Sequence, residues 1–143
     1  MATQHEEVAR RLVVAGLGYS GTAVAREAAA AGWRVVSTAR DPARASAPPG
    51  VEVVPFAEAG PAIAAATHLL ATAAPGEGTG DPVLAAHAAA VRAAPGLRWI
   101  GYISTTGVYG DRGGGWVEET TPPTPMRRRS AAGWIVPRRG SCP

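Results

Sequence analysis

Short apolar runs alternate with helix-forming stretches over the first hundred residues. The runs are rich in Val, Ile and Leu, as is typical of strands buried on both faces of a sheet. They predict five strands, at residues 12–15, 34–38, 51–56, 67–73 and 97–104. Alanine-rich stretches between them predict helices at residues 22–31, 58–66 and 82–94. Strands that alternate with helices indicate an α/β fold whose parallel sheet is covered on both faces.

Helix-capping and turn-forming residues support these boundaries. Gly32 suits a helix C-terminus, and Asp81 followed by Pro82 suits an N-cap followed by the first helical position. Residues 41–50, which end in two prolines and a glycine, are a predicted loop, and residues 75–80 form a glycine-rich turn. Trp99 and Tyr102 lie on the fifth strand and are expected in the core.

Three glycines with G-x-G-x-x-G spacing join the first strand to the first helix. Gly16 permits a tight turn, Gly18 lets a pyrophosphate approach the backbone, and Gly21 lets the helix pack closely on the strand. The helix N-terminus offers free amides to the phosphates. The segment therefore predicts a dinucleotide-binding turn in which Tyr19 and Ser20 also contact the pyrophosphate. A purely structural glycine turn is the alternative.

The end of the second strand bears on the choice of cofactor. NAD-binding sites usually place an acid there for the ribose 2′-hydroxyl, but this chain has Ala39 followed by Arg40. Because arginine pairs well with a 2′-phosphate, we expect NADP, with NAD as the alternative through Asp41. Thr72 and Ala73, at the end of the fourth strand, are expected to line the nicotinamide-ribose side.

A second motif follows the fifth strand, where "STTGVYG" precedes Glu118–Glu119 and "PPTP". With the glycine turn and "THLLATAAP", it resembles the extended short-chain dehydrogenase/reductase family, in particular its atypical, NAD(P)-dependent epimerase/dehydratase-like branch. The resemblance covers about residues 10–125. It implies a Rossmann-type doubly wound parallel sheet, here incomplete with about five strands, and chemistry on a small carbonyl or nucleotide-sugar-like substrate.

The resemblance also implies catalytic residues. Thr105 matches the family's catalytic hydroxyl, and Tyr109 matches the tyrosine of the V-Y-G block, which is not the usual acid/base. The family's Tyr-x-x-x-Lys pair is absent, because all 14 basic residues are arginine. Proton transfer must therefore come from elsewhere or does not occur. The alternative is that the hydroxyls of Ser104, Thr105 and Thr106 only cap backbone groups.

The character of the chain changes near its end. Five of the arginines follow Met126, so residues 1–126 carry nine arginines against 11 acids, a net charge of −2. We predict a dinucleotide-binding domain at 1–126 and an irregular basic tail at 127–143. The sheet would keep an uncovered edge and an apolar face, so we expect a chain truncated by a frameshift near residue 126. No nucleic-acid motif accompanies the basic tail, and no nucleic-acid partner is expected.

Other features limit the range of functions. No apolar run is long enough to span a membrane, and the N-terminus lacks the pattern of a signal peptide, so we expect a cytoplasmic protein without a membrane partner. His5, His68 and His87 are scattered, and no metal site is expected. The sequence leaves open whether the chain forms a homo-oligomer.

Three interpretations remain. The first is the cofactor-binding half of an NADP-dependent oxidoreductase or epimerase. The second is a non-catalytic NADP(H)-binding module, such as a redox sensor. The third is a non-functional fragment.

Overall fold

The computed structural model describes residues 9–75 and 80–126. Within these ranges, five parallel strands form one sheet in the order β3-β2-β1-β4-β5. The strands are β1 (Arg11–Ala15), β2 (Arg34–Ala39), β3 (Val51–Pro55), β4 (His68–Ala71) and β5 (Trp99–Tyr102). The central position of β1 places the following turn where the strand order reverses, which is the usual ligand-binding point of such sheets. The predicted α/β class is confirmed.

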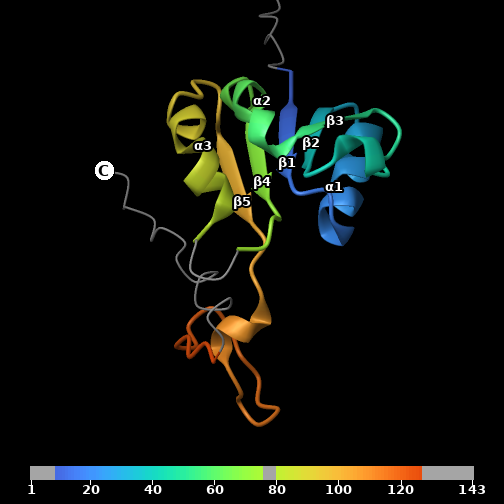
Figure 1. The fold of residues 1–143 in the computed structure, drawn as a ribbon. Coiled ribbons are helices and arrows are strands. Elements are labelled where there is room, and N and C mark those ends of the chain that lie inside the picture. Colours follow the sequence, from blue (N-terminus) through green and yellow to red (C-terminus); the bar gives the residue numbers. More distant parts are fainter. Residues whose placement is uncertain (1–8, 76–79, 127–143) are drawn as a thin grey trace, which may run out of the picture.

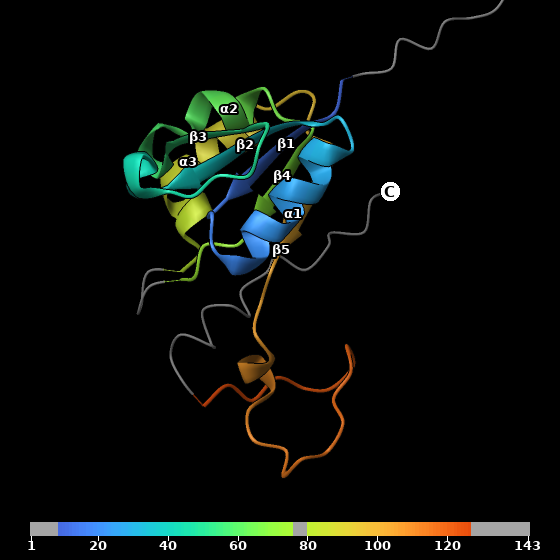
Figure 2. The ribbon, with the colours of Figure 1, turned by 90° about the vertical axis from the view of Figure 1, so that its right-hand side faces the viewer.

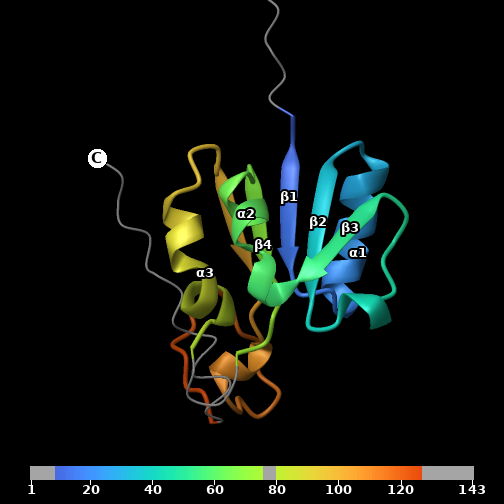
Figure 3. The same cartoon turned by 45° about the horizontal axis from the view of Figure 1, so that its top comes forward.

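Three helices cover the sheet, with α1 (Tyr19–Ala30) on one face and α2 (Gly60–Ala64) and α3 (Pro82–Arg92) on the other (Figures 1, 2 and 3). Two clusters of buried side chains correspond to these layers. The smaller one joins α1 to the sheet around Val14 and Ala25. The larger one joins α2 to the opposite face around Val13 and Ile63. The core thus lies on both sides of β1.

The helix termini follow the predicted chemistry. Gly32, with a φ of 81°, ends α1: its amide donates to Ala29 O, and the amide of Trp33 donates to Ala28 O, each at 3.0 Å. At the start of α3, the Asp81 carboxylate accepts from the amide of Leu84 at 2.8 Å. Both predicted caps are confirmed.

Other boundaries differ from the prediction. The first helix begins at Tyr19 rather than residue 22, because Gly18 is its extended N-cap and Gly21 lies inside its first turn. The second helix shrinks to the five residues of α2, after a short 3-10 turn at Phe56–Glu58. Consequently α2 leaves part of the sheet face over β2 and β3 open.

The fifth strand is less buried than its sequence suggests. Trp99 is 47% exposed and Ile100 is 57% exposed, so the prediction of a core position is wrong for Trp99. Tyr102 is half-buried and packs against the larger cluster. In the described part of the chain, β5 pairs only with β4, which leaves its outer edge and much of both its faces uncovered.

Beyond β5, residues 103–126 form an arm that extends away from the sheet (orange in Figures 1 and 2). The arm folds back on itself, since the Thr124 amide donates to Val108 O at 3.0 Å and the Thr124 hydroxyl donates to Tyr109 O at 2.8 Å. The predicted basic tail at 127–143 and its frameshift, His5, and most of the turn at 75–80 lie outside the described residues.

Candidate nucleotide-binding site

The glycine turn lies at the carboxyl edge of the sheet, between β1 and α1. Gly16 has a φ of 120°, a left-handed conformation that favours glycine. Its amide donates to Val14 O at 3.1 Å, and the amide of Leu17 donates to Thr38 O at 3.0 Å. The turn is therefore tied to its own strand and to β2.

Gly18 and Gly21 meet different environments. A Cβ atom on Gly18 would have no neighbour within 4 Å, so this position leaves open space for a ligand. A Cβ atom on Gly21 would collide with Gly16 O and lie 3.1 Å from the side chains of Thr72 and Val14. Gly21 therefore allows close packing of helix on strand, as the motif predicts.

A pocket of about 680 Å³ opens beside this turn. It is bounded by the glycine turn, by the ends of β2 and β4, and by the start of α3. Its lining residues are Gly16, Leu17, Gly18, Thr38, Ala39, Arg40, Phe56, Thr72, Ala73, Ala74, Pro75 and Pro82. The sequence-predicted residues Gly16, Gly18, Arg40, Thr72 and Ala73 are thus brought together.

The other predicted residues are not part of this lining. Gly21 is buried behind the turn, while Tyr19 is 96% exposed and Ser20 is also exposed. Thr105 accepts a hydrogen bond from the amide of Gly107 at 3.2 Å and caps the short helix Thr106–Tyr109. Tyr109 is half-buried in the arm.

The contact of Thr105 is therefore the one that the alternative interpretation predicts, in which its hydroxyl caps a backbone group. Neither Thr105 nor Tyr109, to which the resemblance assigns catalytic roles, is among the residues that line the pocket.

Phe56 is a pocket residue that the sequence analysis did not select. It follows β3, so the rule that ligands meet the carboxyl ends of parallel strands would have found it. Its carbonyl oxygen accepts a hydrogen bond from His87 Nε2 at 2.7 Å, and the two rings meet edge-on at 5.1 Å. Through this contact, α3 supports one wall of the pocket.

Arg40 and Asp41 are both exposed, but they differ in their positions relative to the pocket. Arg40 lines the pocket. The carboxylate of Asp41 accepts from the amide of Ala43 at 3.1 Å and caps the short 3-10 turn Pro42–Arg44. One carboxylate oxygen of Asp41 is thus bonded to the backbone, and Asp41 is not among the pocket-lining residues, whereas Arg40 is.

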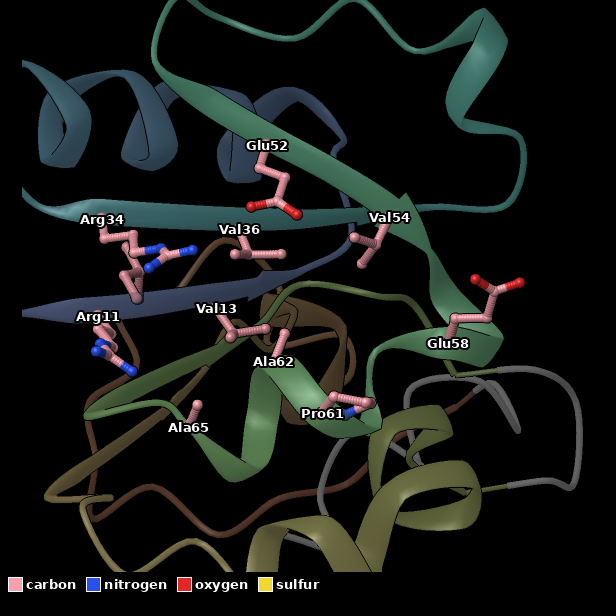
Figure 4. A pocket seen from close by; sticks show the side chains of 11 residues that line it. Arg11, Val13, Arg34, Val36, Glu52, Val54, Glu58, Pro61, Ala62 and Ala65 are labelled. Atoms are coloured by element: carbon pink, nitrogen blue, oxygen red, sulfur yellow. The ribbon is translucent and has the colours of Figure 1, made fainter.

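A second hollow, of about 320 Å³, lies on the sheet face that α2 leaves open (Figure 4). Arg11 and Arg34 are register partners at one end of it, and Glu52 and Glu58 contribute carboxylates. Valines of β1, β2 and β3 form its floor. No residue of the glycine turn lines this hollow, so it lacks the features of a dinucleotide site.

Among the described residues, no helix has both the length and the apolarity to cross a membrane. In the same ranges, no three His, Cys, Asp or Glu side chains gather in a group that could hold a metal ion.

Solved structures with similar folds were found, whereas protein-family models and curated proteins gave no match. A conserved protein of unknown function from Silicibacter pomeroyi DSS is 43% identical, with a TM-score of 0.74 over 86% of this chain and 45% of its own. A candidate epimerase from Burkholderia cenocepacia J2315 is 26% identical, with a TM-score of 0.65 over 87% and 46%.

A short-chain dehydrogenase/reductase superfamily protein from Agrobacterium tumefaciens, crystallised with bound NAD, is 21% identical, with a TM-score of 0.63 over 87% of this chain and 42% of its own. The chain thus spans less than half the length of these three structures. The predicted resemblance is confirmed at the level of the fold: this chain has the Rossmann-type fold of NAD-dependent epimerases/dehydratases and the short-chain dehydrogenase/reductase superfamily.

Proposed function

We propose that this chain binds NADP(H) in the pocket beside the glycine turn. The observation that carries the proposal is the meeting of the glycine turn, the N-terminus of α1 and Arg40 around one pocket. Gly18 caps α1 without a side-chain hydrogen bond, and the first turn of the helix carries no acid. The first amides of α1 are therefore free to bind phosphate oxygens.

The preference for NADP over NAD is supported by Arg40. Arg40 lines the pocket, and its guanidinium suits a 2′-phosphate, while the neighbouring Asp41 lies outside the lining and uses one carboxylate oxygen to cap its turn. The Agrobacterium protein was crystallised with NAD, which favours a nicotinamide dinucleotide as the general class. The preference for the phosphorylated form rests on the residues of this chain.

Calorimetric titration with NADPH and NADH tests this proposal. We expect the chain to bind NADPH more tightly by about tenfold or more, because a hydrogen bond to a charged group contributes about 1.5–3 kcal/mol. Arg40→Ala should remove most of this preference and leave NADH affinity nearly unchanged. Arg44→Ala is the matched control, since Arg44 is an exposed arginine of the same loop outside the pocket lining. Equal affinity of the unmodified chain for the two cofactors would contradict the NADP assignment.

Oxidoreductase or epimerase chemistry on a carbonyl or nucleotide-sugar-like substrate is our proposal for a protein in which this unit acts with a substrate-binding part. This proposal is supported by the length of the similar structures, because this chain covers less than half of each of them. A non-catalytic binding module is the second candidate, favoured by the absence of lysine and by the placement of Thr105 outside the pocket lining.

NADPH oxidation with a panel of carbonyl compounds separates the two candidates. Turnover that Thr105→Ala abolishes supports the enzyme. Tight NADPH binding without turnover supports the module.

A further inference from the structure

The segment after β4 is bonded closely to the glycine turn. The amides of Thr72 and Ala73 both donate to Ala15 O, at 3.0 and 2.9 Å. The hydroxyl of Thr72 lies 2.6 Å from Gly16 O and 3.3 Å from Ala15 O. A hydroxyl carries a single proton, and the shorter distance identifies Gly16 O as its main acceptor.

This hydroxyl contributes to fixing one peptide unit, the one that joins Gly16 to Leu17. Its carbonyl oxygen accepts from Thr72, which follows β4, and its N–H group donates to Thr38 O on β2. Both polar groups of the peptide are therefore held, one by each neighbour of β1 in the sheet. A peptide held at both ends cannot rotate without breaking two hydrogen bonds, and the orientation of the next residue, Gly18, follows from it.

The same hydroxyl also fills the space that the glycines leave. A Cβ atom on Gly16 would lie 2.6 Å from Thr72 Oγ1, and one on Gly21 would lie 3.1 Å from it. Thr72 thus packs against the first and third glycines of the motif, while the second glycine faces open space.

From this geometry we propose that Thr72 is a positioning residue for the phosphate-binding turn. Its hydroxyl holds the Gly16–Leu17 peptide so that the amides at the start of α1 present themselves to the pyrophosphate. The inference rests on the proposed cofactor function and differs from the sequence expectation, in which Thr72 lines the nicotinamide-ribose side. The two roles differ for ADP, which has the pyrophosphate but no nicotinamide. Loss of the Thr72 hydroxyl should weaken ADP binding if Thr72 positions the turn, and should leave it unchanged if Thr72 only contacts the nicotinamide ribose.

Three variants test the role. Thr72→Val keeps the shape and removes the donor, and Thr72→Ser restores the hydroxyl. Thr67→Val is the matched control, because Thr67 lies at the other end of β4 and its hydroxyl donates to Arg11 O at 3.0 Å, far from the turn. NADPH and ADP affinities are measured by calorimetry well below the melting temperature. Hydrogen exchange of the Leu17 amide is followed in the ligand-free chain.

We expect Thr72→Val to weaken NADPH and ADP by the same factor, about five- to tenfold for one lost hydrogen bond, and to accelerate exchange of the Leu17 amide. Thr72→Ser should bind both ligands within about twofold of the unmodified chain, since it keeps the donor. Thr67→Val should lose stability but keep both affinities and the slow exchange of Leu17. If Thr72→Val does not fold, Thr72→Ala replaces it.

Each contrary result has a distinct meaning. Weakened NADPH binding with unchanged ADP binding would assign Thr72 to the nicotinamide half and overturn the positioning role. Unchanged affinities with unchanged Leu17 exchange would reduce the hydroxyl to an ordinary packing group. If the unmodified chain binds neither ligand, the proposed cofactor function fails, and the Leu17 exchange rate alone decides whether Thr72 holds the turn.

Discussion

Replacement of Gly21 by alanine tests whether this glycine is needed for close packing of α1 on the sheet, rather than for the approach of a ligand. In an ordinary helix interior this change stabilises by about 1 kcal/mol. Here the added methyl group would collide with Gly16 O and press on Thr72 and Val14 at 3.1 Å. Overpacking of this kind costs about 1–3 kcal/mol, and backbone atoms yield less readily than side chains. We expect a net loss of up to about 2 kcal/mol, once the helix-propensity gain is subtracted.

Thermal unfolding followed by circular dichroism measures this loss. For a chain of 143 residues, each kcal/mol lowers the melting temperature by about 2–4 °C. Gly18→Ala is the comparison, because its methyl group would meet no atom and its φ of −91° suits alanine. It should change stability by less than about 0.5 kcal/mol, yet weaken NADPH binding by blocking the approach of the pyrophosphate. A stabilised Gly21→Ala variant, or two variants with equal melting temperatures, would refute the packing argument.

Further predictions concern α3 and β5. Asp81→Ala should destabilise by about 1 kcal/mol through loss of the N-cap, whereas Asp81→Asn keeps the cap. The pKa of Tyr102 is raised by burial and by the charge of Asp81, so stability should fall as the pH rises above 10. Asp81→Asn should lower that pKa in an ultraviolet titration, and an unchanged titration would contradict the coupling. His87→Ala should cost about 1–3 kcal/mol in a thermal melt, because it leaves the carbonyl of Phe56 unpaired; an unchanged melt would show that water replaces the imidazole. Ile100→Lys should leave stability within about 0.5 kcal/mol and reduce light scattering at high concentration, because charge on an edge strand opposes pairing between chains; unchanged scattering would contradict the expectation that β5 pairs between chains.

The strands were predictable because their signal is local. Each one is a short apolar run, and the alternation of such runs with helix-forming stretches predicts a parallel sheet. The start of α1 was misplaced by three residues, because helix propensity alone penalises Gly21 and does not detect that Gly18 serves as the N-cap. Trp99 was misassigned because an apolar residue on a strand predicts burial only where another element covers that strand.

The site was predictable where a motif fixes the backbone, and less so elsewhere. The glycine spacing and the position of Arg40 after β2 led directly to residues that line the pocket. The bond between Thr72 and Gly16 could not be inferred, since it joins residues 56 positions apart and depends on the rotamer of one side chain. The placement of Thr105 also escaped sequence reasoning, because the path of the arm after β5 is set by its own hydrogen bonds rather than by any periodicity.

The contact between Thr72 and Gly16 also has a consequence for the order of folding. The segment β1-α1-β2-β3 is continuous in sequence and could form early, yet it lacks the strand that completes the turn. Contacts between distant residues form late, because a long loop must first be closed. A nascent chain that has released only its first sixty residues therefore carries the glycine motif without the completed turn at which we propose that phosphate binds. The onset of nucleotide binding during refolding should report the docking of β4, and a fluorescent nucleotide would time that single event.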